Sequence, residues 1–311
     1  MSGEMGRRDG PGCGSRNTSP RRVDDSGAVH SMFIGSEALS RGEVTPYQLR
    51  ARFRRVFPDV YGPDGAQLSV SDLACGAWLW SRRRAVLSGV TASALHGAAW
   101  VDDRLPIEVN YPNNKTPPGI VSHNNTLHAD EIQTRRTLPV TTVPRTAFDL
   151  ARHGTVGQAV ARLDALANAT GFPVDDVLEL AARHHNLRGV RRVRQVLDLV
   201  DAGAQSPKET WLRLLYLDAG FPRPRTQIPV QGPDNRPKYF LDMGWEEVMV
   251  AAEYDGEHHR VDRFTYTNDI RRSEYLGALG WRVIRVVVGN RRPEIIERTR
   301  RAWASSQNSA R

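Results

Sequence analysis

The chain has 311 residues, a net charge of +8 and 40% hydrophobic residues, a size and composition that suit about two domains with cores of their own. Its two cysteines, Cys13 and Cys75, exclude a disulfide framework and a cysteine-based zinc site. No apolar run approaches the roughly 18 residues of a membrane span, and no secretion signal opens the chain. We therefore expect a cytoplasmic protein with no membrane partner.

The basic residues are almost all arginine, since only Lys115, Lys208 and Lys238 are lysine. A GC-rich genome is enough to explain this bias. A sequence pI near 9.9 also permits an anionic partner, of which nucleic acid is the commonest. Charge alone does not decide between the two explanations.

Residues 1–31 are rich in glycine, serine and charge, and we expect a disordered tail there, with Met32 as a candidate start of the protein. Residues 32–65 predict a short helix, a turn, a second helix begun by a capping box, and a two-stranded wing in VFPDVYGP. This order suggests a winged helix-turn-helix with its second helix, YQLRARFRR, in a DNA groove. An ordinary solvated face is the alternative for the arginines on that helix, Arg50, Arg52, Arg54 and Arg55.

Residues 66–205 are predicted to be mainly helical, with a strand in PIEVNYP and a β-leaning segment in GIVSHNNTL. His184 and His185 precede the last helical pattern, LRGVRRVRQVLDLVD, where a cap or a surface pair fits better than a metal site. Residues 202–205 suggest a linker. Residues 206–303 then predict a separate α/β unit with the order α-β-β-β-α-β-α, and residues 304–311 a disordered tail.

Acidic residues gather at one end of the central hairpin predicted for this unit. If KYFLDMG and VMVAAEY pair symmetrically about Glu247 and Val248, Asp242 lies opposite Glu253, with Cβ atoms about 4.5–5.5 Å apart. Asp255 shares a strand face with Glu253. Carboxylates so close repel unless a cation joins them, and Mg²⁺ or Mn²⁺ is the ion that such a group favours. A polar hairpin end that reaches solvent is the alternative.

The segment from about Ser206 to Trp303 resembles the very-short-patch-repair-like endonucleases of the PD-(D/E)xK superfamily. The motifs occur in order: Glu209 in SPKETWLRLL, Asp242 in YFLDMGW, and Glu253, Asp255 and His259 in EYDGEHH. They continue with Asp269 and Arg272 in DIRR and with Gly280 and Arg285 in GWRVIRV. The resemblance implies a restriction-endonuclease-like core and hydrolysis of phosphodiester bonds in double-stranded DNA.

This resemblance also implies roles for the matched residues. Asp242 and Glu253 would bind the metal, Asp255 would bind or orient it, and His259 would transfer a proton. Arg272 and Arg285 would contact phosphate, or else pair with Asp269. The usual third-motif lysine of the superfamily is absent, because Asp255 stands at its position. Glu209 is either part of the catalytic group or a helix cap.

Residues 32 to about 150 more loosely resemble the N-terminal part of AbiEi-like type IV antitoxins. The similarity lies in GSEALSRGEVTPYQLRARFRRVFPDVYGP and in ALHGAAW. Two functions therefore stand side by side: a metal-dependent DNA endonuclease targeted by its N-terminal region, and a non-catalytic, antitoxin-like DNA-binding regulator that keeps a nuclease fold. The sequence leaves open whether the chain forms a homodimer.

Overall fold

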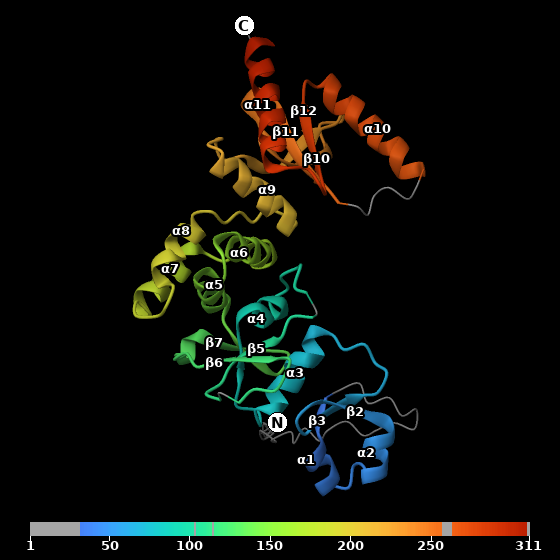
Figure 1. Ribbon diagram of the computed structural model, residues 1–311, viewed down its shortest axis with the longest axis vertical. Coiled ribbons are helices and arrows are strands. Elements are labelled where there is room, and N and C mark those ends of the chain that lie inside the picture. Colours follow the sequence, from blue (N-terminus) through green and yellow to red (C-terminus); the bar gives the residue numbers. More distant parts are fainter. Residues whose placement is uncertain (1–31, 103, 114, 257–262, 310–311) are drawn as a thin grey trace, which may run out of the picture.

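The computed structural model describes residues 32–102, 104–113, 115–256 and 263–309. The described chain is a mixed α/β protein with three sheets, which follow one another along the long axis of the molecule (Figure 1). The predicted tail at 1–31 and the histidines His258 and His259 lie outside the described residues. Among the described helices, none combines the length and the apolar character needed to cross a membrane.

The N-terminal part has the predicted order of two helices and a hairpin. A capping box between Thr45 and Gln48 begins the second helix, as expected. The hairpin is joined by a third, short strand, which gives the sheet order β1-β3-β2. The elements are β1 (Phe33–Ile34), α1 (Gly35–Ser40), α2 (Pro46–Arg52), β2 (Phe53–Phe57) and β3 (Val60–Pro63).

The arginine-rich helix is shorter than predicted. It ends at Arg52, so Arg54 and Arg55 lie on strand β2 and not on the helix. Phe53 packs edge to face on Phe33 with ring centroids 4.9 Å apart, and Arg54 pairs with Gly62 across the hairpin. Because of these contacts with β1 and β3, the segment from Phe53 forms a strand and does not continue the helix. All four predicted arginines remain exposed.

The middle part contains more sheet than the sequence predicted. Its five strands have the order β6-β5-β4-β8-β7, and β4, β7 and β8 were not anticipated. The strands are β4 (Val86–Leu87), β5 (Ile107–Asn110), β6 (Ile120–His123), β7 (Ile132–Arg135) and β8 (Leu138–Thr141). The missed strands are only two to four residues long, which is too short for a clear alternating pattern.

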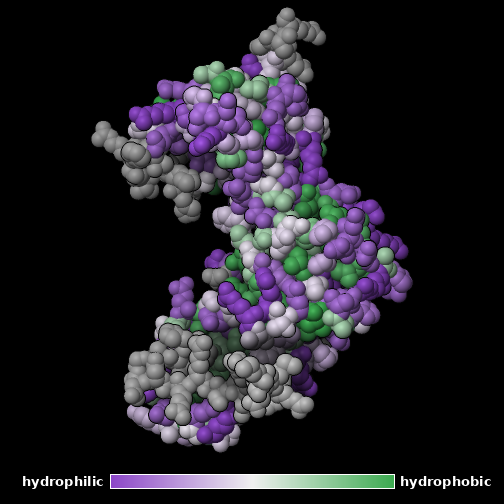
Figure 2. Space-filling model, turned by 180° about the vertical axis from the view of Figure 1, so that it is seen from behind, coloured by the Kyte–Doolittle hydropathy of each residue, from purple (hydrophilic) through white to green (hydrophobic). Residues whose placement is uncertain are grey.

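Helices cover this sheet and continue toward the C-terminal part (Figure 1). They are α3 (Val70–Trp80), α4 (Gly89–Leu95), α5 (Val143–Arg152), α6 (Val156–Thr170), α7 (Val174–Arg183) and α8 (Val193–Leu197). The pattern LRGVRRVRQVLDLVD forms only α8 and a preceding 3-10 turn. Gly189 has φ +84°, and a Cβ there would lie 2.4 Å from the carbonyl oxygen of Arg152. The left-handed backbone and close packing of this glycine interrupt the predicted helix at residue 189. Hydrophobic surface gathers on this middle part in the rear view (Figure 2).

The C-terminal part has the predicted α-β-β-β-α-β-α order. Its sheet order is β12-β11-β10-β9, in which only the β11–β12 pair is parallel. The elements are α9 (Pro207–Asp218), β9 (Arg225–Gln231), β10 (Pro237–Trp245), β11 (Val250–Asp255), α10 (Arg263–Ala278), β12 (Arg282–Val287) and α11 (Arg292–Ser309). The expected disordered tail from residue 304 is wrong, because α11 continues to Ser309 through a segment without glycine or proline.

A buried ion pair joins the C-terminal part to the middle part. Arg213 on α9 donates to Asp164 on α6 at 2.7 Å, and their side chains are 0% and 2% exposed. Thr210 Oγ1 and the backbone N–H of Asp201 also donate to the Asp164 carboxylate, each at 2.8 Å. Residues 202–205, which the sequence suggested as a linker, therefore lie beside a fixed contact between the two parts.

We expect Asp164→Ala to lower the free energy of unfolding by about 3 kcal/mol, because it leaves the Arg213 guanidinium buried without its counter-ion. Urea unfolding of the whole chain measures the change. Asp218→Ala is the matched control, since Asp218 is exposed on the same helix as Arg213, and its effect should stay within about 0.5 kcal/mol. Equal effects of the two substitutions would contradict a stabilising role for the pair.

Candidate active site

The register of the β10–β11 hairpin is the one that the sequence predicted. Trp245 pairs with Val250, Gly244 with Ala251 and Met243 with Ala252. The next residues along the two strands are Asp242 and Glu253. The backbone N–H of Tyr254 donates to Asp242 Oδ2 at 3.0 Å, which fixes the carboxylate at the end of the ladder.

These side chains line a cavity of about 290 Å³. The three acidic residues expected to converge all face it, although they come from two strands. Helix α10 and strand β12 complete the wall with an acidic group and two guanidinium groups. The lining residues are Asp242, Glu253, Tyr254, Asp255, Asp269, Arg272 and Arg285. The predicted constellation thus forms one site, with both charge signs in it.

Burial and the neighbouring acidic groups both raise the pKa of Asp242. Burial raises the pKa of this carboxyl from 3.8 to about 7, and the nearby charges of Glu209 and Glu253 add to the rise. The hydrogen bond from Tyr254 and the charge of Arg272 act in the opposite direction but do not cancel it. A cation beside this carboxylate would favour its ionised form, which is what a metal ligand requires.

Arg272 binds Glu253 and not Asp269. Its two terminal nitrogens donate to the two carboxylate oxygens of Glu253 at 2.8 and 2.5 Å, and one also donates to the carbonyl of Phe240 at 2.8 Å. This fork geometry is the strong form of an arginine–carboxylate pair. Arg285 donates instead to Ser273 Oγ at 2.8 Å. The alternative in which either arginine pairs with Asp269 is therefore not what the described residues show.

Glu209 lies at the N-terminus of α9, outside the residues that line the cavity. Ser206 Oγ donates to Glu209 Oε1 at 2.9 Å and the backbone N–H of Gln205 donates to Glu209 Oε2 at 2.8 Å. The Glu209 backbone N–H donates to Ser206 Oγ at 3.2 Å, so Ser206 caps the helix, while the Glu209 carboxylate reaches the residue before the N-cap. Burial raises the pKa of Glu209. Its role in the structure is that of a cap whose charge also acts on Asp242.

The described geometry of this site does not include the remaining predicted residues. His259 lies outside the described residues, so its place relative to the carboxylates is not part of the described geometry. The N-terminal arginines lie on α2 and β2, at the opposite end of the molecule from β10 and β11 (Figure 1). A nucleic acid that touched both places would have to extend along the molecule.

A cluster in the middle part, formed by one exposed histidine and two buried residues, was not predicted from sequence. His128, Glu131 and His184 have potential ligand atoms that all lie within 4.8 Å of one another, so this group could hold a metal ion. His184 follows the last residue of α7, as the cap interpretation expected, but it is only 9% exposed and is not a surface residue. Glu131 also accepts a hydrogen bond from the fully buried Arg145. Arg145 and His184, which both contact Glu131, are 14 and 53 residues away from it in the sequence. No short sequence motif therefore contains all three residues.

No family model matches this chain. It is similar to two uncharacterized proteins of Mycobacterium tuberculosis, one from strain CDC 1551 / Oshkosh and one from strain H37Rv. Each is 29% identical over 149 residues, which cover 48% of this chain and 55% of the relative. The match thus spans about half the length of these relatives. No solved structure matches.

The raised pKa of Asp242 predicts a pH-dependent effect of Asp242→Asn. The wild-type carboxyl keeps its proton in the folded state up to about pH 7 but loses it near 3.8 when unfolded, so wild-type stability falls as pH rises between these values. Asparagine cannot ionise and escapes this loss. In EDTA, the free energy of unfolding of the variant should rise relative to that of the wild type by up to a few kcal/mol from about pH 5 to pH 8. This follows from roughly 1.4 kcal/mol per pKa unit.

Urea unfolding at both pH values measures this difference, with Asp218→Asn as the exposed control from the same part of the chain. A stability difference between Asp242→Asn and wild type that stays constant across the range would show that Asp242 is not forced toward its neutral form.

Proposed function

We propose that the protein is a metal-dependent DNA endonuclease. The observation that carries the proposal is the cavity in which Asp242, Glu253 and Asp255 meet Arg272 and Arg285. Ordinary sheets keep acidic residues apart, because opposed like charges destabilise a strand pair. Carboxylates that share a cavity with arginines suit a site for a divalent cation and a phosphodiester. The order of elements around it supports the restriction-endonuclease-like core that the motifs of residues 206–303 imply.

Asp242 and Glu253 hold the ion in this proposal, and Asp255 binds or orients it. The donor set fits Mg²⁺ or Mn²⁺, because all of its groups are carboxylate oxygens. A bound ion would lower the pKa of a coordinated water and offset charge on the phosphate. Arg285 would contact the phosphate oxygens, and Arg272 would also do so if Glu253 held the ion instead of its guanidinium. His259 transfers the proton to or from the reacting oxygen, as its position in EYDGEHH implies.

The N-terminal part delivers the enzyme to double-stranded DNA. Its two short helices, followed by a hairpin, support the winged helix-turn-helix proposed for residues 32–65. Arg50 and Arg52 on α2 and Arg55 on β2 are exposed and suited to phosphate contacts. Arg54 is held differently, since it donates to the carbonyl of Ala66 at 3.0 Å.

The second candidate function is a non-catalytic, antitoxin-like DNA-binding regulator. One observation favours it: the forked pair between Arg272 and Glu253 already neutralises a carboxylate that the nuclease needs for its metal. The absence of the third-motif lysine points the same way. In this case Arg272 stabilises the scaffold and the cavity has no catalytic role.

Cleavage of supercoiled and mismatched DNA in Mg²⁺ and in Mn²⁺ separates the two functions. We expect Glu253→Gln to abolish cleavage, because a neutral amide holds the ion poorly, while the fold is kept. Glu247→Gln is the matched control, since Glu247 is an exposed acid in the same hairpin connection, and should cut like the wild type. His259→Ala should lose roughly 10²–10⁴-fold in rate if the imidazole transfers a proton.

Wild-type protein that cuts nothing in either metal would favour the regulator. Cleavage by Glu253→Gln at the wild-type rate would place the chemistry outside this cavity. Melting temperatures measured alongside show whether a loss of cleavage follows from unfolding.

DNA binding by the N-terminal part predicts a change in salt dependence. Each lost phosphate contact should lower the slope of log K against log salt by about 0.9, so Arg50→Ala with Arg52→Ala should lower it by roughly 1.8. The control is Arg191→Ala with Arg194→Ala, which removes equal charge from exposed positions in the middle part. Fluorescence anisotropy with a labelled duplex gives both slopes. An unchanged slope in the first variant would assign Arg50 and Arg52 to an ordinary solvated face.

A further inference from the structure

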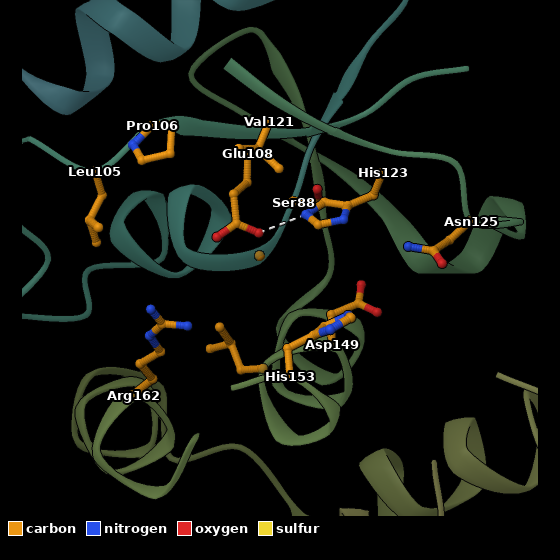
Figure 3. A pocket seen from close by; sticks show the side chains of 12 residues that line it. Ser88, Leu105, Pro106, Glu108, Val121, His123, Asn125, Asp149, His153 and Arg162 are labelled. Atoms are coloured by element: carbon orange, nitrogen blue, oxygen red, sulfur yellow. Dashed lines mark hydrogen bonds and ion pairs between the residues drawn. The ribbon is translucent and has the colours of Figure 1, made fainter. Parts of the chain in front are cut away.

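A second cavity lies in the middle part, beside the five-stranded sheet. The carboxylate hairpin belongs to another sheet, the four-stranded one. The volume of this second cavity is about 310 Å³. Strands β5 and β6 form one side, and α4, α5 and α6 close the other (Figure 3). Leu105 and Leu150 give it an apolar lining, whereas Ser88, His123, His153 and Arg162 bring polar groups to it. A largely apolar space with a few converging polar groups is the usual form of a small-molecule site.

Ser88 carries a buried hydroxyl without a partner. The residue is 3% exposed, and its Oγ makes no hydrogen bond to any other described group. A serine directly before a helix normally accepts a hydrogen bond from the first turn. Here Glu108 Oε1 accepts from the backbone N–H of Val90 at 3.4 Å, while the Ser88 side chain caps nothing. A buried unpaired hydroxyl is unfavourable, so a bound group that pairs with it would stabilise the site.

The carboxylate of Glu108 is fixed at the side of the cavity. Its Oε2 lies 2.8 Å from His123 Nε2, and a Cβ on Gly89 would come within 2.1 Å of it. Gly89 has φ +55°, a conformation that favours glycine, and the absence of a side chain there leaves room for the Glu108 carboxylate. The ring of His153 stacks on that of His123 with centroids 5.9 Å apart. Burial, with the charge of Arg152, lowers the pKa of His153, so its ring is a neutral donor and acceptor.

Arg162 supplies a cation that no described acid neutralises. It is half-buried on α6, forms no hydrogen bond or ion pair with another described residue, and directs its guanidinium into the cavity (Figure 3). Asp149 also lines the cavity, but its two oxygens already accept from Arg145 and Arg152, at 2.9 and 3.0 Å. The cavity thus contains one guanidinium whose donors are all available to a ligand.

We propose that this cavity binds a small organic monoanion, a carboxylic acid that carries one further hydroxyl or carbonyl group. The planar fork of Arg162 pairs with the carboxylate, a geometry that arginine matches bidentately. The carbon skeleton packs against Leu105 and Leu150, and the second polar group bonds to Ser88 and His153. The fixed charge of Glu108 disfavours a second negative charge on the ligand. The volume suits a single ring or a short chain and is too small for a dinucleotide.

Calorimetry on the full chain with four probes tests this proposal: 4-hydroxybenzoate, 3-hydroxybutyrate, 4-hydroxybenzamide and inorganic phosphate. We expect at least one of the two acids to bind, and 4-hydroxybenzamide and phosphate to bind at least about tenfold more weakly, since one lacks the charge and the other the apolar body. Arg162→Gln should weaken binding of the acid by about tenfold or more. Ser88→Ala should weaken a hydroxylated acid but leave its deoxy analogue, benzoate or butyrate, unchanged.

Arg191→Gln is the matched control, because it removes the same charge from an exposed position outside the cavity, and it should bind the acid like the wild type. Melting temperatures without ligand show that each variant is folded. Failure of both acids to bind wild-type protein would overturn the proposal, as would unchanged binding in Arg162→Gln. Phosphate that binds as tightly as the acids would also overturn it, because the site would then be a simple anion contact. These measurements need neither metal nor DNA, so their outcome is independent of the endonuclease proposal.

Discussion

The register of the β10–β11 hairpin is the constraint on which the carboxylate site depends. Met243 pairs with Ala252, and this places Asp242 beside Glu253 at the open end of the ladder. A shift by one residue would turn every side chain of β11 to the other face, where Ala251 now packs in a separate core cluster. Burial of the apolar residues of β11 therefore fixes where the acids meet.

Buried or partly buried arginines recur as the groups that join separate elements of this protein. Arg213 joins α9 to α6 through Asp164, Arg145 joins Glu131 to Asp149, and Arg272 joins α10 to Glu253. In each case a guanidinium with several donors meets carboxylates or carbonyls that come from elsewhere in the chain. A composition biased to arginine thus has a structural use, apart from any attraction to nucleic acid. Arg162 differs from these arginines, because it forms no ion pair with a described residue.

The two sites differ in how polar groups are placed. At the carboxylate hairpin, the acidic groups are close in sequence and one cation would satisfy several of them. In the middle cavity, Ser88 directly precedes α4 and Arg162 lies on α6, and each is left without a partner in the described chain. Local sequence can reveal the first arrangement, since strand pairing at a hairpin is a short-range event. The second depends on packing between elements that are more than 70 residues apart.

Patterns in the sequence identified the carboxylate hairpin, the capping box at Thr45 and the order of elements in residues 206–303, because each rests on periodicity or on neighbours in the chain. They placed Arg54 and Arg55 on a helix, missed β4, β7 and β8, and ended the last helix too early. They also gave no sign of the fork between Arg272 and Glu253 or of the group around Glu131. Such pairs form only when helices pack on sheets, so long-range packing, and not local preference, decides them.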